Sequence, residues 1–89
     1  MKKIKFNPGL LSGITLILEG DFIRYVSGTN INEQGSIPIK SIKTITVEPG
    51  AKNRTMVNFV GEGTSLGGFS TGINYAQKCQ AWLIEQLKL

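Results

Sequence analysis

The spacing of the apolar residues changes from that of strands to that of a helix once along the chain, at about Gly72. Before this point, short apolar runs alternate with glycine-rich or polar segments, and after it apolar residues recur every three or four positions. Successive strands followed by one helix predict a mainly β member of the α+β class. A chain of 89 residues has room for one domain, which we take as residues 1–89.

The clearest hairpin signal is the stretch GITLILEGDFIRYVSG. Two apolar runs flank Glu19-Gly20-Asp21, where the glycine can supply the positive φ of a tight turn. The first run is apolar on both faces, which is typical of a strand that is covered on each side. We expect both arms to cross a sandwich or barrel.

The stretch GSIPIKSIKTITVEPG changes its apolar period twice. Ile37 and Ile39 are spaced to share one face of a short strand, and Ile45 and Val47 to share one face of the next. The three-residue steps between these pairs predict a 3₁₀ turn around residues 38–42.

The glycine-rich segment VGEGTSLGGFSTG follows another predicted strand, RTMVNFV. A dinucleotide-binding loop would need a third glycine at Leu66, so a phosphate loop is disfavoured. We interpret Gly67 and Gly68 as sites of close strand approach or of a bulge. Phe69-Ser70 is expected to end a last short strand.

The C-terminal period predicts a capping helix over residues 72–88, with Ser70 or Thr71 as its N-cap. Its central stripe is predicted to be buried: Ala76, Cys79, Leu83 and Leu87. Tyr75 and Trp82 flank this stripe on one side, and Ile73 and Ile84 on the other. The apolar arc of about 200° is wider than one sheet covers. Either the helix closes a barrel and touches it on two sides, or one flank meets a second subunit.

These features together resemble the small bacterial pleckstrin-homology-like (PH-like) domains of unknown function, over roughly residues 13–89. The matching positions are Gly20, Asp21, Phe22 and Ile23, then Ile37, Pro38, Ile39 and Ile42, then Tyr75, Trp82 and Leu83. The resemblance implies an antiparallel sandwich or partly open barrel of about six or seven strands, capped by one C-terminal α-helix. It makes residues 1–12 a strand or arm and residues 13–70 a strand meander.

Phosphoinositide-binding members of this family carry Lys and Arg in the loop that joins the first two strands. We take that loop to be Glu19-Gly20-Asp21, which is acidic. The resemblance therefore implies that no phosphoinositide binds in the usual pocket.

The residue types that most often carry catalysis are scarce in this chain. There is no histidine, so triads built on histidine are excluded, and the single cysteine, Cys79, cannot assemble a structural zinc site. Cys79 lies on the predicted buried stripe, where a cysteine acts as a small hydrophobe. We expect no enzyme activity, no catalytic or metal-binding residues and no cofactor.

Ten Lys and Arg residues against six Asp and Glu give a net charge of +4. A surface that binds nucleic acid or another anion needs the cations to converge on one face. The candidate anion contacts are Lys2, Lys3, Lys5, Lys40 and Lys43. Apart from the N-terminal group the basic residues are dispersed, as is typical of a solvated surface, so anion binding is the alternative hypothesis.

The leading hypothesis is a protein-interaction module that self-associates. The apolar residues exceed what so small a core needs, which nominates the segment Ile4–Leu11 and the flanks of the helix as contact surfaces. The candidate interface residues are Leu10, Leu11, Ile73, Tyr75, Trp82 and Ile84. Tyr75 and Trp82 fit a place in the core as well as one in an interface. No signal peptide or membrane span is evident, so we expect a cytoplasmic protein.

Overall fold

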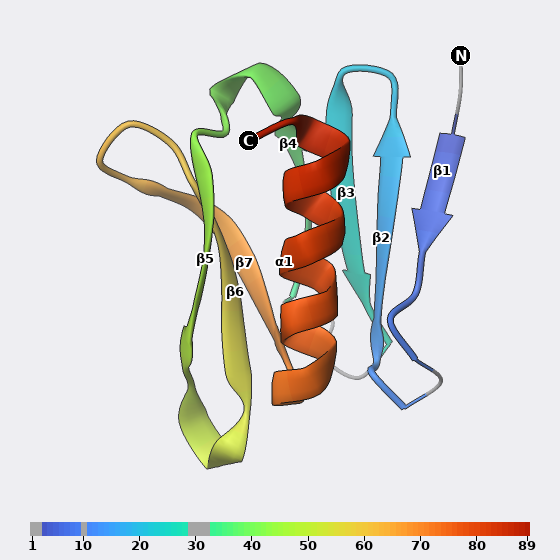
Figure 1. Cartoon of the computed structure of the whole chain (residues 1–89), viewed down its shortest axis with the longest axis vertical. Helices are drawn as coiled ribbons and strands as arrows, with labels where there is room; N and C mark the ends of the chain where they lie inside the picture. Colours follow the sequence, from blue (N-terminus) through green and yellow to red (C-terminus); the bar gives the residue numbers. More distant parts are fainter. Residues whose placement is uncertain (1–2, 10, 29–32) are drawn as a thin grey trace.

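The computed structural model describes residues 3–9, 11–28 and 33–89, so the predictions for Lys2 and Leu10 lie outside the described residues. The described residues form seven strands, two short 3₁₀ turns and one α-helix (Figure 1). The strands are β1 (Lys3–Phe6), β2 (Ile14–Glu19), β3 (Phe22–Ser27), β4 (Gln34–Pro38), β5 (Thr44–Pro49), β6 (Thr55–Val60) and β7 (Ser65–Thr71). The turns are η1 (Ile39–Ser41) and η2 (Ala51–Asn53), and the helix is α1 (Ile73–Leu87).

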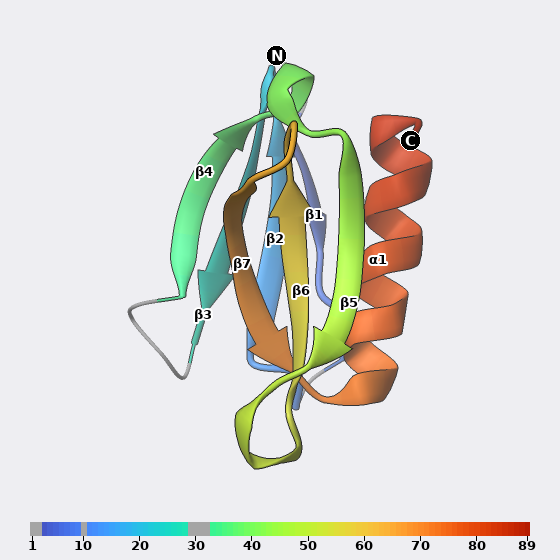
Figure 2. The same cartoon turned by 90° about the vertical axis from the view of Figure 1, so that its left-hand side faces the viewer.

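The strands form two antiparallel sheets, with the order β1-β2-β3-β4 in sheet A and β5-β6-β7 in sheet B. Figure 2 shows sheet B in front of sheet A, with α1 alongside β5. The predicted α+β class, mainly antiparallel β with a C-terminal helix, is confirmed.

The core lies between the sheets and is centred on three aromatic side chains. The Tyr25 ring lies 5.4 Å from the Phe59 ring and 5.7 Å from the Phe69 ring, measured between centroids. Glycines leave room for Tyr25 on both sheets, because a Cβ atom at Gly35 or Gly67 would lie within 2.7 Å of the Tyr25 hydroxyl oxygen. The ladder is irregular beside Gly67, where Phe59 pairs with Gly67 but Val60 pairs with Ser65, so of the two predicted roles the bulge is confirmed.

Helix α1 presents most of the predicted stripe to the core, since Ala76, Cys79 and Leu83 are fully buried, whereas Leu87 is only partly buried. It touches the sandwich on two sides. The Gln80 side-chain amide donates to the Ile45 carbonyl of β5 at 3.0 Å, and Trp82 stacks on Phe6 of β1. The flanks of the wide apolar arc therefore meet one sheet each.

The predicted N-cap is wrong, because Gly72 caps α1 without a side-chain hydrogen bond. The Thr71 hydroxyl donates instead to the Ser12 carbonyl at 2.9 Å, and the Ser70 hydroxyl donates to the Glu33 carboxylate. Both hydroxyls are used to join distant segments, so neither is free to cap the helix.

Two further details differ from the sequence expectations. Ile39 begins the predicted 3₁₀ turn, so β4 ends one residue earlier, at Pro38. The last strand, β7, starts at Ser65 and includes Gly67 and Gly68, because pairing with β6 outweighs the poor strand propensity of glycine.

The turn Glu19-Gly20-Asp21 joins β2 to β3, and the positive φ of 59° at Gly20 fits its predicted role. The turn was expected to join the first two strands. It joins the second strand to the third, because residues Lys3–Phe6 form an earlier strand, β1. The loop between β1 and β2 is residues 7–13, with the sequence NPGLLSG, which contains no Lys or Arg.

Candidate functional site

The structure places the predicted interface residues Tyr75 and Trp82 against the N-terminal segment of the same chain. The Trp82 and Phe6 rings stack with centroids 4.9 Å apart, and a Cβ atom at Gly9 would lie 2.5 Å from the Tyr75 ring. Both side chains are half-buried. Their apolar surface is thus used largely within the chain.

The other predicted interface residues that the structure describes are exposed and come from two elements, a loop and the helix. Leu11, in the loop between β1 and β2, is 88% exposed. Ile73 and Ile84 are 50% and 37% exposed. They are eleven positions apart, about three helical turns, and therefore lie on one flank of α1, the flank of Gln80 that borders β5.

The predicted anion contacts are also divided. Lys3 and Lys5 belong to β1, Lys40 to η1, and Lys43 lies next to β5 with its ammonium 3.9 Å from Glu62. Lys3 is 3.6 Å from Glu19, which also lies 3.7 Å from Arg24. The four nominated lysines that the structure describes therefore come from three separate segments, and Lys3 and Lys43 are each paired with a carboxylate.

Strand β5 is the edge of sheet B that faces α1. Gly50 donates to the Arg54 carbonyl at 2.7 Å, and the register pairs Glu48 with Met56 and Val47 with Val57. Hydrogen-bonded pairs alternate along an antiparallel ladder, so the backbone groups of Glu48 face β6 and those of Val47 face away from it. Val47 thus offers an N–H and a C=O on the outer edge of the sheet.

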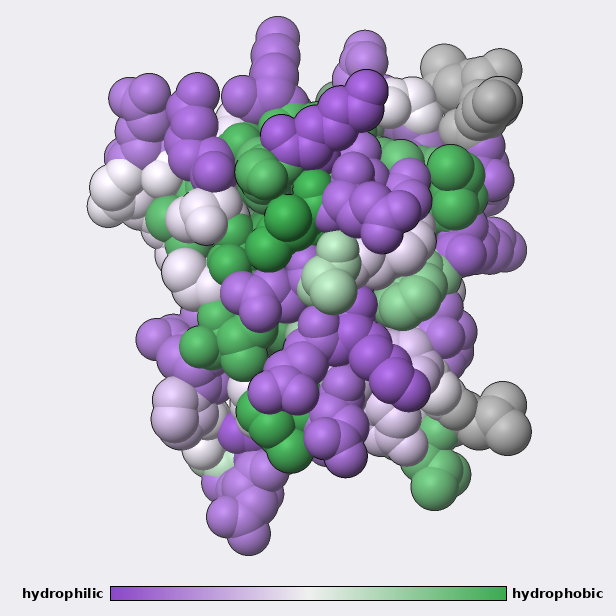
Figure 3. All heavy atoms as spheres, in the orientation of Figure 1, coloured by the Kyte–Doolittle hydropathy of each residue, from purple (hydrophilic) through white to green (hydrophobic). Residues whose placement is uncertain are grey.

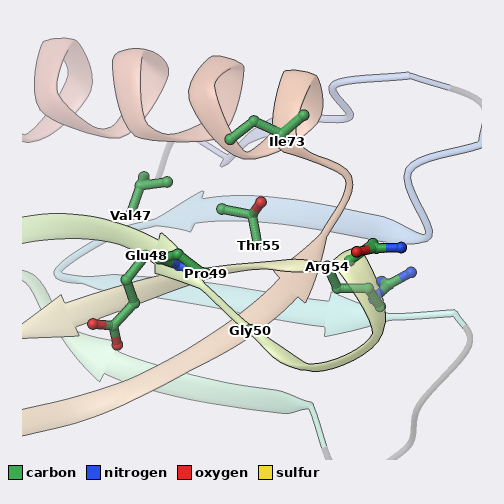
Figure 4. Close-up of a pocket in the computed structure, with 8 residues that line it drawn as sticks. Val47, Glu48, Pro49, Gly50, Arg54, Thr55 and Ile73 are labelled. Atoms are coloured by element: carbon green, nitrogen blue, oxygen red, sulfur yellow. The ribbon is translucent and has the colours of Figure 1, made fainter.

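A hollow of about 360 Å³ lies between the end of β5 and the first turn of α1 (Figure 4). Val47 and Thr55 point toward Ile73 across it, while Glu48 points to the other side of the strand. The lining residues are Val47, Glu48, Pro49, Gly50, Asn53, Arg54, Thr55 and Ile73. We call this hollow the β5–α1 groove.

Part of the apolar surface on this side of the molecule lies along the seam between β5 and α1. Figure 3 shows apolar side chains along that line, interrupted by polar ones, and others over the region of β1 and β2. Ile73 lies toward one end of the seam and Ile84 toward the other, with Gln80 bridging to β5 between them. The seam therefore offers apolar contacts on both sides of a polar bridge.

The charged side chains at the groove are held by neighbours in sheet B. Arg54 donates through Nη2 to the Ser70 carbonyl at 2.8 Å and through Nε to the Ser70 hydroxyl, and Glu48 accepts a hydrogen bond from Asn58. Among the described residues no group of three His, Cys, Asp or Glu side chains could hold a metal ion.

Sequence reasoning missed the groove, since it assigned Val47 only to one face of a strand. The available signal was Pro49, because a residue without an N–H group cannot pair on both sides inside a sheet and so indicates an edge strand.

Cys79 lies in the core, as the sequence predicted. It is fully buried, and burial raises the pKa of its thiol to about 12, so it is no nucleophile.

Comparison with models of known protein families, with curated proteins and with solved structures finds no match to this chain. Within the described residues, α1 is too short and too polar to cross a membrane.

Proposed function

We propose that this chain is a PH-like domain that acts as a non-enzymatic protein-interaction module, with the β5–α1 groove as its binding site. The observation that carries the proposal is the hollow at the edge of sheet B, where Val47 turns its backbone groups outward beside the half-exposed Ile73. The occupant is an extended segment of a partner polypeptide.

An extended segment fits this groove for two reasons. A strand that lies along β5 can exchange hydrogen bonds with the outward N–H and C=O of Val47, as in β-strand addition. Its alternate side chains then point to the apolar wall formed by Val47, Pro49 and Ile73. Backbone pairing supplies affinity, and the wall selects an apolar side chain at one position.

The order of the elements supports the PH-like part of the proposal. Seven antiparallel strands in two sheets, followed by one C-terminal helix, match the sandwich of about six or seven strands with a capping helix that the resemblance implies. We expect the protein to act in the cytoplasm, because its single cysteine cannot form an intrachain disulfide.

Self-association belongs to the same proposal. Leu11, Ile73 and Ile84 leave apolar surface exposed, and a second copy of the chain is one partner that could cover it.

Selection from a library of phage-displayed random peptides tests the groove. We expect peptides with an apolar residue within an extended segment to be captured by the wild type. Ile73→Asp should abolish capture, because it places a carboxylate in the apolar wall. The matched control is Asn74→Asp, which adds the same charge to the same turn of α1 at an exposed position outside the groove. Enriched peptides that bind both variants equally, or no enrichment at all, would contradict the proposal.

A further inference from the structure

The outer face of sheet A carries a group of cations that is separate from the β5–α1 groove. Antiparallel register places Lys5, Ile17 and Arg24 in one row across β1, β2 and β3. Lys3, Glu19 and Phe22 form the next row on the same face. The buried residues Leu16, Ile23 and Tyr25 alternate with these rows, so the two rows point away from the core. We call Lys3, Lys5, Arg24 and Phe22 the cationic face.

The cationic face has an excess of positive charge. Glu19 is the one carboxylate within the two rows, and it is shared by Lys3 and Arg24 at 3.6 and 3.7 Å. Lys5 has no ion pair within the described part of the chain. Arg24, which the sequence did not nominate, thereby joins the predicted anion contacts Lys3 and Lys5.

Two apolar residues complete this surface. Ile17 is only 9% exposed although it points outward, which indicates that the aliphatic stems of Lys5 and Arg24 cover it and hold their charged ends at the surface. Phe22 is 46% exposed and lies opposite Pro38 on β4. An aromatic ring is thus accessible beside the cations on the outer face of sheet A.

We propose that the cationic face binds single-stranded nucleic acid, with the phosphates on Lys3, Lys5 and Arg24 and a base stacked on Phe22. Single strands are bound in this way by surfaces that combine a basic track with exposed aromatic rings. A duplex fits less well, because its bases are stacked inside and the cationic face presents no helix or two-stranded ribbon that could enter the major groove.

An anionic membrane is the less favoured occupant. Asp21 directly precedes Phe22, and Glu19 lies opposite it in the ladder. Insertion of the Phe22 ring into a bilayer would therefore require both carboxylates to give up water, whereas a base can stack on the ring while the carboxylates stay solvated.

Fluorescence anisotropy with labelled oligo(dT) of about 15 nucleotides tests the proposal at low and moderate salt. Three phosphate contacts on a single strand predict that log K falls with log[salt] with a slope of about −2. Lys5→Gln/Arg24→Gln should weaken binding about tenfold and reduce the slope to about −0.7. Phe22→Ser should weaken binding about fivefold or more with the slope unchanged.

The matched control is Lys52→Gln/Lys78→Gln, which removes the same charge from exposed positions in η2 and α1, outside the cationic face. It should retain nearly the wild-type affinity. Circular dichroism and thermal melting verify that each variant is folded. Equal weakening by the control would mean that only net charge matters and would overturn the proposal. The proposal would also fail if oligo(dT) did not bind at low salt, or if polyglutamate or phosphatidylserine vesicles bound more tightly.

Discussion

The ring of Phe6 in β1 stacks on the ring of Trp82 in α1, with centroids 4.9 Å apart and planes only 8° from parallel. This contact fastens the first strand of sheet A to one flank of the helix. On the other flank, Gln80 bonds to the Ile45 carbonyl of sheet B. The helix therefore joins the edges of the two sheets, and each of its flanks has a structural task.

Substitution of Trp82 tests the structural role of this stack. Trp82→Ala should lower the free energy of unfolding by about 2 to 3 kcal/mol, less than the about 3 to 5 kcal/mol typical of fully buried aromatics, because the ring is half-buried. Urea denaturation followed by circular dichroism measures the change. Lys78→Ala, at an exposed position of the same helix, is the control and should change stability by less than about 0.5 kcal/mol. If Trp82→Ala were as stable as the wild type, Trp82 would not contribute to folding, and its assignment as an interface residue would be favoured again.

Gly67 gives a second test, because a side chain there has no space. Its backbone has a φ of +156°, and a Cβ atom would lie 2.6 Å from the Tyr25 hydroxyl oxygen. We expect Gly67→Ala to destabilise the fold by about 2 to 3 kcal/mol. Gly28→Ala, whose Cβ atom would have no neighbour closer than 4.0 Å, should cost less than about 1 kcal/mol.

The reason for the Gly67 effect can be checked in a double-mutant cycle. Tyr25→Phe removes the oxygen that the new methyl group would meet, so Gly67→Ala should cost less in that background. If the two substitutions lowered the free energy of unfolding by independent, additive amounts, the cost of Gly67→Ala would come from backbone strain and not from contact with the Tyr25 hydroxyl.

Local patterns were enough to predict the hairpin around Gly20, the 3₁₀ turn before Ile42 and the buried stripe of α1. Each depends on residues close in sequence, whose spacing reports directly on the backbone. The extent of β7 was not predictable in this way, because its two central glycines mask the strand and only pairing with β6 reveals it. The prediction of the helix N-cap failed for a similar reason, because the Thr71 hydroxyl donates a hydrogen bond to the carbonyl of Ser12, which is far away in the sequence.

The candidate site depends even more on long-range geometry. The β5–α1 groove exists because β5 ends at Pro49 beside the first turn of α1, and no local pattern relates Val47 to Ile73. The cationic face requires the register that brings Lys5 and Arg24 into one row. Spacing along the chain shows where the basic residues are, but it could not place Arg24 beside Lys5.

Cys79 should be protected from thiol reagents as long as the protein is folded. Its side chain is fully buried and burial raises its pKa to about 12, so both access and thiolate formation are suppressed. Ellman's reagent at pH 8 should react only after urea is added. Rapid reaction of the folded protein would contradict the buried position.

The same burial makes stability depend on alkaline pH. The Cys79 thiol has its ordinary pKa of 9.0 in the unfolded chain, whereas burial raises the pKa to about 12 in the folded one, so the unfolded state binds fewer protons above pH 9. The contribution of Cys79 is therefore complete below about pH 9 and falls by about 1.4 kcal/mol per pH unit above it. The stability difference between the wild type and Cys79→Ala should narrow over that range. A constant difference up to about pH 11 would show that the thiol ionises equally in both states.

The proposed self-association is motivated by the apolar side chains that the fold leaves exposed, and light scattering after size exclusion tests it. We expect the mean mass to rise above the 9.7 kDa of one chain as the concentration increases, because Leu11 and Ile73 are accessible to a second copy. Leu11→Ser/Ile73→Ser should remove the rise, and Gln77→Ser, at an exposed polar position, should leave it unchanged. A mass of 9.7 kDa at every concentration would exclude self-association. If a groove-binding peptide dissociates the oligomer, the second copy occupies the β5–α1 groove, whereas an oligomer that persists with the groove filled must form through the side that carries Leu11.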